Sequence, residues 1–166
     1  MPRAYFVPEA KVVKSGKEAF DEIKLITHLG PKTVILEDNP KVVPPDFNGS
    51  LEDFKKENPV KINNLTNNKV EIETDIKVHG FLILNDIYYP GWKADIDGVK
   101  TNILRANYLI RAVELDPGKH TIRFYYDPIS FKIGGGISLI GLICLICYMS
   151  YTSYKSYTSY RTKKHV

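Results

Sequence analysis

Three aromatic side chains stand close together in the stretch 85–98, which reads NDIYYPGWKADIDG. Tyr88, Tyr89 and Trp92 surround a Pro-Gly pair, which is typical of a tight turn. Aromatic faces pack against the C–H faces of sugar rings, and nearby charged side chains bind hydroxyl groups. We therefore predict a glycan-binding site made of Tyr88, Tyr89, Trp92, Asp86, Lys93 and Asp95. In the alternative interpretation Trp92 anchors the core and the tyrosines are ordinary strand residues.

A second candidate site lies a few residues further along the chain. Arg105, Asn107 and Arg111 predict a phosphate-binding site, because a guanidinium group presents a planar fork of donors to phosphate oxygens. A lipid-linked sugar and a polyol-phosphate polymer are examples of ligands that carry such a phosphate. In the alternative interpretation these three residues are solvated strand positions.

The carboxylates of this region do not predict catalysis. Asp95 and Asp97 are two positions apart and share one face of a strand. However, Asp97-Gly98 is a strong signal for a two-residue hairpin turn, and the paired carboxylates of a glycosidase usually come from separate elements. We predict no catalytic residue in this chain.

The histidines and cysteines give no metal signal. His28, His79 and His120 are far apart and lack the spacing of metal ligands. Cys144 and Cys147 are embedded among Ile and Leu, where thiols usually serve as small apolar fillers. We therefore predict no metal site and no cofactor.

The elements that would position these residues are mostly strands. Hydrophobic and polar residues alternate over 70–75, which is the pattern of a strand with one buried face. Strands at spacings of about ten residues predict an antiparallel β-sandwich over 59–128. Before it we expect a small strand-helix-strand segment over 1–36, whose helix runs from Ser15 to about Thr27 with Glu18 as capping-box partner, and a Pro-rich linker over 37–58.

The C-terminal part is different in composition. Residues 133–149 carry no charge and would span about 26 Å as a helix, so we predict a transmembrane helix over 130–151 and a basic tail over 152–166. The fold class is mainly β, an antiparallel β-sandwich with one short N-terminal helix, plus a C-terminal transmembrane helix. Much of the net charge of +4 lies in the tail, so no basic face remains for nucleic acid.

The charges also predict an orientation. Four basic residues follow the helix, so the positive-inside bias places the tail in the cytoplasm and the β-domain outside. The first ten residues contain no long apolar stretch of a signal peptide. We therefore expect earlier membrane helices, a start further upstream, or a tail-anchored protein in the opposite orientation.

An ordered series of short motifs runs along the chain: Pro2-Arg3-Ala4-Tyr5, Tyr89-Pro90-Gly91-Trp92-Lys93-Ala94 with Asp97-Gly98, Arg105-Ala106-Asn107, Arg111-Ala112-Val113, Pro117-Gly118-Lys119-His120 and Phe124-Tyr125-Tyr126-Asp127-Pro128. From Pro2 to about Leu145 the chain resembles the C-terminal region of YfhO-type bacterial membrane proteins. Those large polytopic proteins resemble the GT-C class of glycosyltransferases, which use lipid-linked sugars outside the cytoplasmic membrane.

The resemblance implies a function for the domain and no catalysis of its own. In the GT-C class the catalytic acid lies in an early extracytoplasmic loop among N-terminal helices, and no segment of this chain matches that loop. We expect a membrane-anchored extracytoplasmic accessory domain that positions a glycan acceptor or donor. Its partners would be the lipid bilayer, a polytopic glycosyltransferase subunit, and a lipid-linked sugar or cell-envelope glycan. The alternatives are a non-enzymatic surface adhesion or binding module anchored by one helix, and a tail-anchored cytoplasmic protein.

Overall fold

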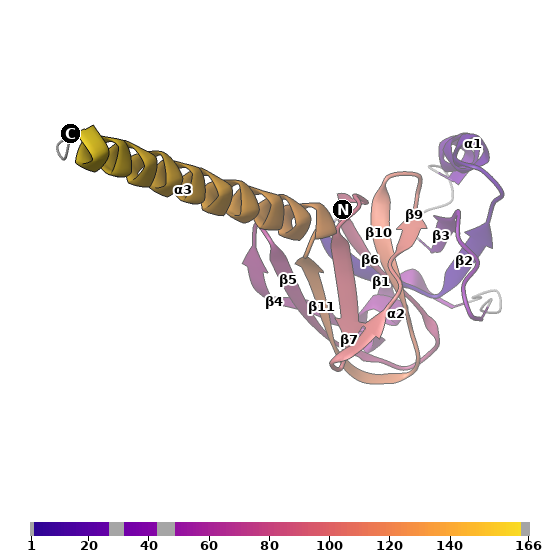
Figure 1. The fold of residues 1–166 in the computed structure, drawn as a ribbon. Helices are drawn as coiled ribbons and strands as arrows, with labels where there is room; N and C mark the ends of the chain where they lie inside the picture. The colour runs from indigo at the N-terminus through magenta and orange to yellow at the C-terminus, as the bar shows by residue number, and fades with distance from the viewer. Residues whose placement is uncertain (1, 27–31, 43–48, 164–166) are drawn as a thin grey trace. The chain divides into compact units, whose positions relative to one another are not determined.

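The computed structural model describes residues 2–26, 32–42 and 49–163 (Figure 1). The chain divides into two compact units, Met1–Asp127 and Pro128–Val166. The first unit contains the strands and two short helices, and the second contains one long helix.

The strands of the first unit form two sheets (Figure 1). In spatial order the six-stranded sheet contains β1 (Ala4–Val7), β6 (Gly80–Ile87), β10 (Ile110–Leu115), β9 (Leu104–Ala106), β3 (Thr33–Leu36) and β2 (Glu9–Val12). The five-stranded sheet contains β4 (Val60–Thr66), β5 (Lys69–Ile76), β11 (Gly118–Tyr126), β7 (Trp92–Ile96) and β8 (Val99–Thr101). The prediction of a mainly β, antiparallel sandwich is confirmed.

One strand pair departs from the antiparallel pattern. β2 and β3 are parallel, and the chain between them forms helix α1 (Gly16–Ile26). Parallel neighbours need such a crossover connection, because a short turn can only reverse the chain. The predicted capping is present in part: the Glu18 N–H donates to Ser15 Oγ at 3.3 Å, while the Glu18 carboxylate accepts from the Lys14 N–H. Thr27, the predicted helix end, lies outside the described residues.

The core between the sheets follows the predicted alternation. Val70, Ile72 and Ile76 of β5 point inward, and the acidic residues between them point outward. They pack in one cluster with side chains of β1, β6 and β10 from the facing sheet and of β7 and β11 from their own sheet. This burial is the main stabilising contribution to the sandwich.

Strand β6 is buried on both faces. Leu82 and Leu84 belong to the core between the sheets, whereas Phe81 and Ile83 belong to a second cluster formed within the six-stranded sheet. That second cluster exists because the sheet curls until β2 contacts β6. A strand covered on both sides needs apolar residues at every position, which explains the uninterrupted sequence FLIL.

The predicted division of residues 1–128 differs from the structure. β1, β2 and β3 are strands of the six-stranded sheet and do not form a separate N-terminal segment. The predicted Pro-rich linker over 37–58 includes a second helix, α2 (Leu51–Glu57), whose Phe54 is buried and stacks on Phe6 at 5.7 Å. Strands of four residues carry little local signal, and β1 pairs with a strand nearly eighty residues away.

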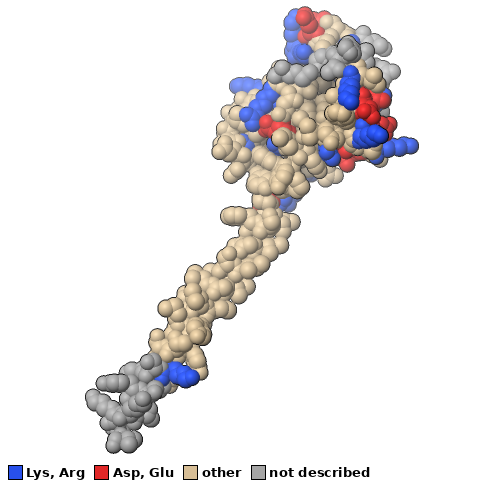
Figure 2. Space-filling view, turned by 90° about the horizontal axis from the view of Figure 1, so that it is seen from above, with Lys and Arg blue, Asp and Glu red and all other residues tan. Residues whose placement is uncertain are grey.

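The second unit is helix α3 (Ile129–Lys163). Its segment Ile129–Lys155 is long and apolar enough to cross a membrane. Between Lys132 and Lys155 the sequence has no charged residue, and Figure 2 shows this stretch without blue or red atoms. The helix continues to Lys163, beyond the end at residue 151 that we predicted, because nothing in the sequence of the tail breaks it.

Candidate functional site

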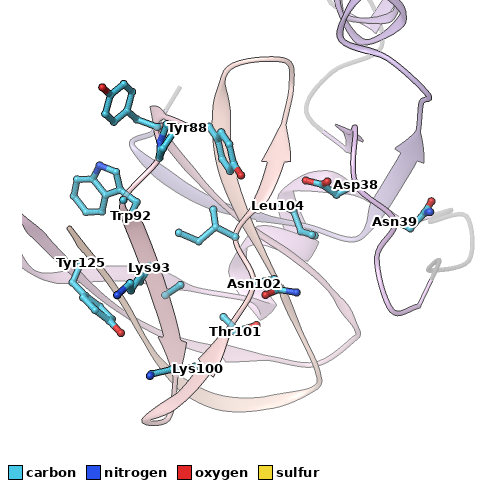
Figure 3. Close-up of a pocket in the computed structure, with 15 residues that line it drawn as sticks. Asp38, Asn39, Tyr88, Trp92, Lys93, Lys100, Thr101, Asn102, Leu104 and Tyr125 are labelled. Carbon is cyan, nitrogen blue, oxygen red and sulfur yellow. The ribbon is translucent and has the colours of Figure 1, made fainter. Parts of the chain in front are cut away.

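The aromatic loop between β6 and β7 lines a cleft with a volume of about 720 Å³ (Figure 3). The cleft brings together the loop, the β7-β8 hairpin, the chain between β8 and β9, and the residues that follow β3. Its lining residues are Asp38, Asn39, Tyr88, Tyr89, Pro90, Gly91, Trp92, Lys93, Ala94, Lys100, Thr101, Asn102, Ile103, Leu104 and Tyr125.

Backbone hydrogen bonds hold the loop in place. The Tyr88 N–H donates to the Leu109 carbonyl at 2.7 Å, and the Asp127 N–H donates to the Gly91 carbonyl at 2.8 Å. Gly91 has a φ of 99°, a conformation that L side chains rarely adopt. The predicted Pro-Gly turn is therefore present, and both sides of it are attached to the sandwich.

The three rings of the predicted glycan site differ in exposure. Tyr88 and Tyr89 are 39% and 60% exposed, whereas Trp92 is half-buried and packs against the core cluster. The Trp92 ring also lies 5.6 Å from the ring of Tyr126, at an interplanar angle of 50°. Trp92 thus lines the cleft and also packs against the core, as the alternative interpretation predicted, and its contact with a glycan stays a prediction.

The three charged residues predicted for the glycan site are separated. Lys93 lines the cleft and forms an ion pair with Asp127 at 2.5 Å. Asp95 is buried and accepts three hydrogen bonds, of 2.8 to 3.1 Å, from the guanidinium of Arg123 on the neighbouring strand. These hydrogen bonds raise the pKa of Arg123. Asp95 stabilises the sheet and does not line the cleft, and Asp86 lies in a second pocket.

Asp97 occupies the hairpin turn that its sequence predicts. Asp97 and Gly98 both have positive φ, and they connect β7 to β8 as a two-residue loop. The Asp97 carboxylate accepts a hydrogen bond from the Thr121 N–H at 2.8 Å and contacts the His120 ring at 2.7 Å. The Thr121 N–H and then the His120 ring lower the pKa of this carboxylate.

Several residues of the cleft were missed by sequence reasoning. Asp38 and Asn39 fell in the predicted linker, and Lys100, Thr101 and Asn102 fell within a strand expected over 99–104, with no binding role predicted for them. Nothing in the local sequence distinguishes them from other polar loop residues. Only the pairing of β3 with β9 and of β7 with β8 brings these segments to one cleft.

The three residues predicted to bind phosphate do not line one pocket, although Arg105 and Arg111 are cross-strand partners on β9 and β10. Asn107, in a left-handed conformation, exchanges hydrogen bonds with the backbone of Ile35 through its Oδ1 and its N–H. Arg105 donates to the Tyr108 carbonyl at 2.7 Å and lies 3.3 Å from Glu37. Both residues attach the β9-β10 turn to neighbouring segments, and neither lies in the pocket that contains Arg111.

Arg111 lines a second pocket, with a volume of about 610 Å³, beside the cleft. The two share Tyr89 and Trp92. The Arg111 guanidinium carbon lies 3.8 Å from the centre of the Trp92 ring. The remaining residues of this pocket are Asn67, Asn68, Asn85, Asp86, Ile87 and Tyr126.

Within residues 2–26, 32–42 and 49–163 there is no group of three or more His, Cys, Asp or Glu side chains that could hold a metal ion. His79 contacts Glu114 at 3.1 Å and Asp116 at 3.0 Å. His28 lies outside the described residues. Cys144 and Cys147 are exposed on α3.

The comparisons with known proteins give one match. A family model described as bacterial membrane protein YfhO matches residues 46–138, which is more than half of the chain. The matched segment includes the aromatic loop, every residue that lines the second pocket, every residue of the cleft except Asp38 and Asn39, and the beginning of α3. It confirms the resemblance that the motifs indicated. No curated protein and no solved structure matches the chain.

Proposed function

The chain belongs to the YfhO family of bacterial membrane proteins, and from this we propose that its β-domain positions a glycan for a glycosyltransferase that uses lipid-linked sugars. The domain holds the acceptor or the donor and is not catalytic alone. The observation that carries this proposal is the cleft of about 720 Å³, which is lined by exposed tyrosine rings and by polar side chains.

The lining chemistry suits a sugar. Rings of Tyr88, Tyr89 and Trp92 provide flat apolar faces, while Asn102 and Thr101 provide donors and acceptors for hydroxyl groups. Small-molecule sites usually have volumes of about 300–1,000 Å³ and a few polar groups that fix orientation, and the cleft has both properties. A site of this size accommodates one or a few sugar units.

The catalytic group is supplied elsewhere in the assembly. In the GT-C class, which this family resembles, the catalytic acid comes from an extracytoplasmic loop of the polytopic membrane region. The β-domain works beside that region, whether both lie on one polypeptide or on two subunits. Its contribution is to hold the glycan in place, which lowers the entropic cost of bringing the reactants together.

The domain lies outside the cytoplasm in this proposal. Lys155, Arg161, Lys163 and Lys164 follow the apolar segment of α3, and an excess of basic residues marks the cytoplasmic side of a membrane helix. The cleft is then on the side of the membrane where GT-C enzymes use lipid-linked sugars.

Binding of neutral oligosaccharides tests the proposal directly. The full chain is purified in a polyoxyethylene detergent, which carries neither sugar nor phosphate, and is titrated with neutral oligosaccharides of bacterial envelopes. Trp92 is the only tryptophan and lines the cleft, so its fluorescence reports occupancy. A saturable change in fluorescence is the expected result.

Two tyrosine variants make the test specific. Tyr89→Ala removes an exposed ring from the cleft and should weaken binding by about tenfold, because tenfold corresponds to about 1.4 kcal/mol, the size of one aromatic contact. Tyr154→Ala removes a similarly exposed ring from α3 and should leave binding unchanged. Absence of saturable binding, or equal binding by both variants, would contradict the proposal. If the chain binds glycan but no polytopic protein is bound to it in mild-detergent extracts, the result would favour the alternative of a non-enzymatic surface binding module.

A further inference from the structure

We propose that the second pocket, beside Trp92, binds the phosphate group of a phosphate-bearing glycan, with Arg111 as its main ligand. The inference rests on the proposed function in one respect, since it names the chemical class of the glycan that the cleft holds. It depends on the burial of Arg111, on the charges around it, and on the residues that the pocket and the cleft share.

The Arg111 side chain is buried although it carries a charge. It lies on the same face of β10 as Val113 and Leu115, which point into the core between the sheets, and its side chain is only 3% exposed. Burial lowers the pKa of Arg111, and the nearby Arg3 lowers it further while Asp86 raises it. A buried guanidinium normally has close, well-aligned acceptors for its N–H groups.

The acceptors that Arg111 has are few and distant. Its Nη2 lies 3.4 Å from the Asp86 carboxylate, and its Nε donates to the Asp86 backbone carbonyl at 3.4 Å. Its Nη1 is buried and has no hydrogen-bond partner among the described residues. Buried donors are almost always satisfied in folded proteins, so an unsatisfied guanidinium nitrogen in a residue that lines a pocket favours an acceptor supplied by a ligand.

The charges of the pocket favour an anion. Asp86 is the only carboxylate among the described residues that line it. That carboxylate is shared, because it also accepts a hydrogen bond from Arg3 at 3.0 Å. Two guanidinium groups therefore surround one carboxylate, which leaves one positive charge uncompensated. The amides of Asn67 and Asn68 provide further donors for an oxyanion.

We expect one ligand to occupy both the cleft and the second pocket, because the two share lining residues. Tyr89 and Trp92 line the cleft and the pocket alike. A sugar against these rings in the cleft would thus have its phosphate next to Arg111, whose guanidinium lies against the Trp92 ring. Phosphate matches a guanidinium fork with several acceptor oxygens.

The direct test uses glycerol 3-phosphate as the probe. It is titrated into the full chain in polyoxyethylene detergent at constant ionic strength, with sodium chloride as the control salt, and Trp92 fluorescence is recorded. We expect a saturable change that chloride does not produce. Arg111→Gln should weaken binding at least tenfold. Lys119→Gln removes an exposed positive charge from the start of β11, seven residues from Tyr126 of the pocket, and should bind as the wild type does. Equal affinities of these two variants would overturn the proposal.

A second variant covers the case in which Arg111→Gln does not fold. Asn67 is exposed in the turn between β4 and β5 and lines the pocket, so Asn67→Asp adds a negative charge with little effect on packing. Its unfolding temperature should equal that of the wild type, and its affinity for glycerol 3-phosphate should fall about tenfold, the effect of one like charge nearby. Unchanged affinity in the folded Asn67→Asp variant would refute the proposal.

Titrations of the full chain with neutral oligosaccharides and with glycerol 3-phosphate distinguish this inference from the proposed function. Neutral oligosaccharide binding without glycerol 3-phosphate binding would refute the phosphate site and leave the glycan cleft. Glycerol 3-phosphate binding without neutral oligosaccharide binding would support the phosphate site and contradict the cleft. The source of the phosphate is then assigned in phosphatidylcholine vesicles. If added phosphatidic acid competes with glycerol 3-phosphate, the site takes a lipid phosphate. If binding of glycerol 3-phosphate is unchanged by phosphatidic acid, the site takes the phosphate of a soluble glycan.

Discussion

Replacement of Trp92 by alanine tests whether its ring is part of the core as well as of the cleft. The ring packs against the core cluster, lies 5.6 Å from Tyr126 and covers the buried guanidinium of Arg111 at 3.8 Å. Removal of a fully buried tryptophan costs about 3–5 kcal/mol, and Trp92 is half-buried, so we expect a loss of about 2–4 kcal/mol in the free energy of unfolding.

The loss should be visible as a lower unfolding temperature of the β-domain. For a domain of this size about 1 kcal/mol corresponds to about 4 °C, so calorimetry of the full chain should show a decrease of roughly 8–16 °C. Trp92→Phe keeps an aromatic ring in the same place and should lose less than half as much. Tyr89→Ala, which removes an exposed ring of the same loop, should change the temperature by no more than about 2 °C.

A melting temperature of Trp92→Ala within about 2 °C of the wild type would refute the core contribution of this ring. The ring would then belong to the cleft alone, and a loss of glycan binding in this variant would be a direct measure of its contact with the ligand. If the predicted loss of stability occurs, reduced binding by Trp92→Ala has two causes, and Tyr89→Ala is the better probe of the cleft.

Three further outcomes can be measured on the full chain. Gly80→Ala should reduce the free energy of unfolding by about 1–3 kcal/mol in a denaturant titration, because the added Cβ would lie 2.5 Å from the Val7 carbonyl oxygen. Folding lowers the pKa of Asp97 below 3.8, so its contribution to stability is present above that pH and lost below it. Asp97→Asn should therefore have a lower unfolding temperature than the wild type at neutral pH, and this difference in unfolding temperature should become smaller at acid pH. A difference that is the same at all pH values would contradict this. The last outcome concerns orientation, and single-cysteine variants are expressed in a background without Cys144 and Cys147. A membrane-impermeant maleimide should label Val99→Cys in intact cells and Thr162→Cys only after permeabilisation. The reverse pattern of labelling would exclude an extracytoplasmic β-domain.

The sequence by itself determined the local elements of this protein. The alternation over β5, the apolar segment Ile129–Lys155 of α3 and the Asp97-Gly98 turn each depend on residues that are near one another in the chain. Such patterns report which face of an element is buried, because side chains alternate across a strand with a period of two. The motif series also indicated the family whose model matches residues 46–138.

Only the tertiary structure decided which side chains share a site. Periodicity assigns Asp95 to a face of β7, but the register with β11 places Arg123 opposite it and makes it a structural carboxylate. In the same way, the pairing of β1 with β6 brings Arg3 to Asp86, more than eighty residues away in the chain. The pairing of β6 with β10 brings Arg111 to the same carboxylate, more than twenty residues away. These contacts depend on long-range strand pairing and on the curling of a sheet, which arise from the packing of the whole domain and leave no signal in the local sequence.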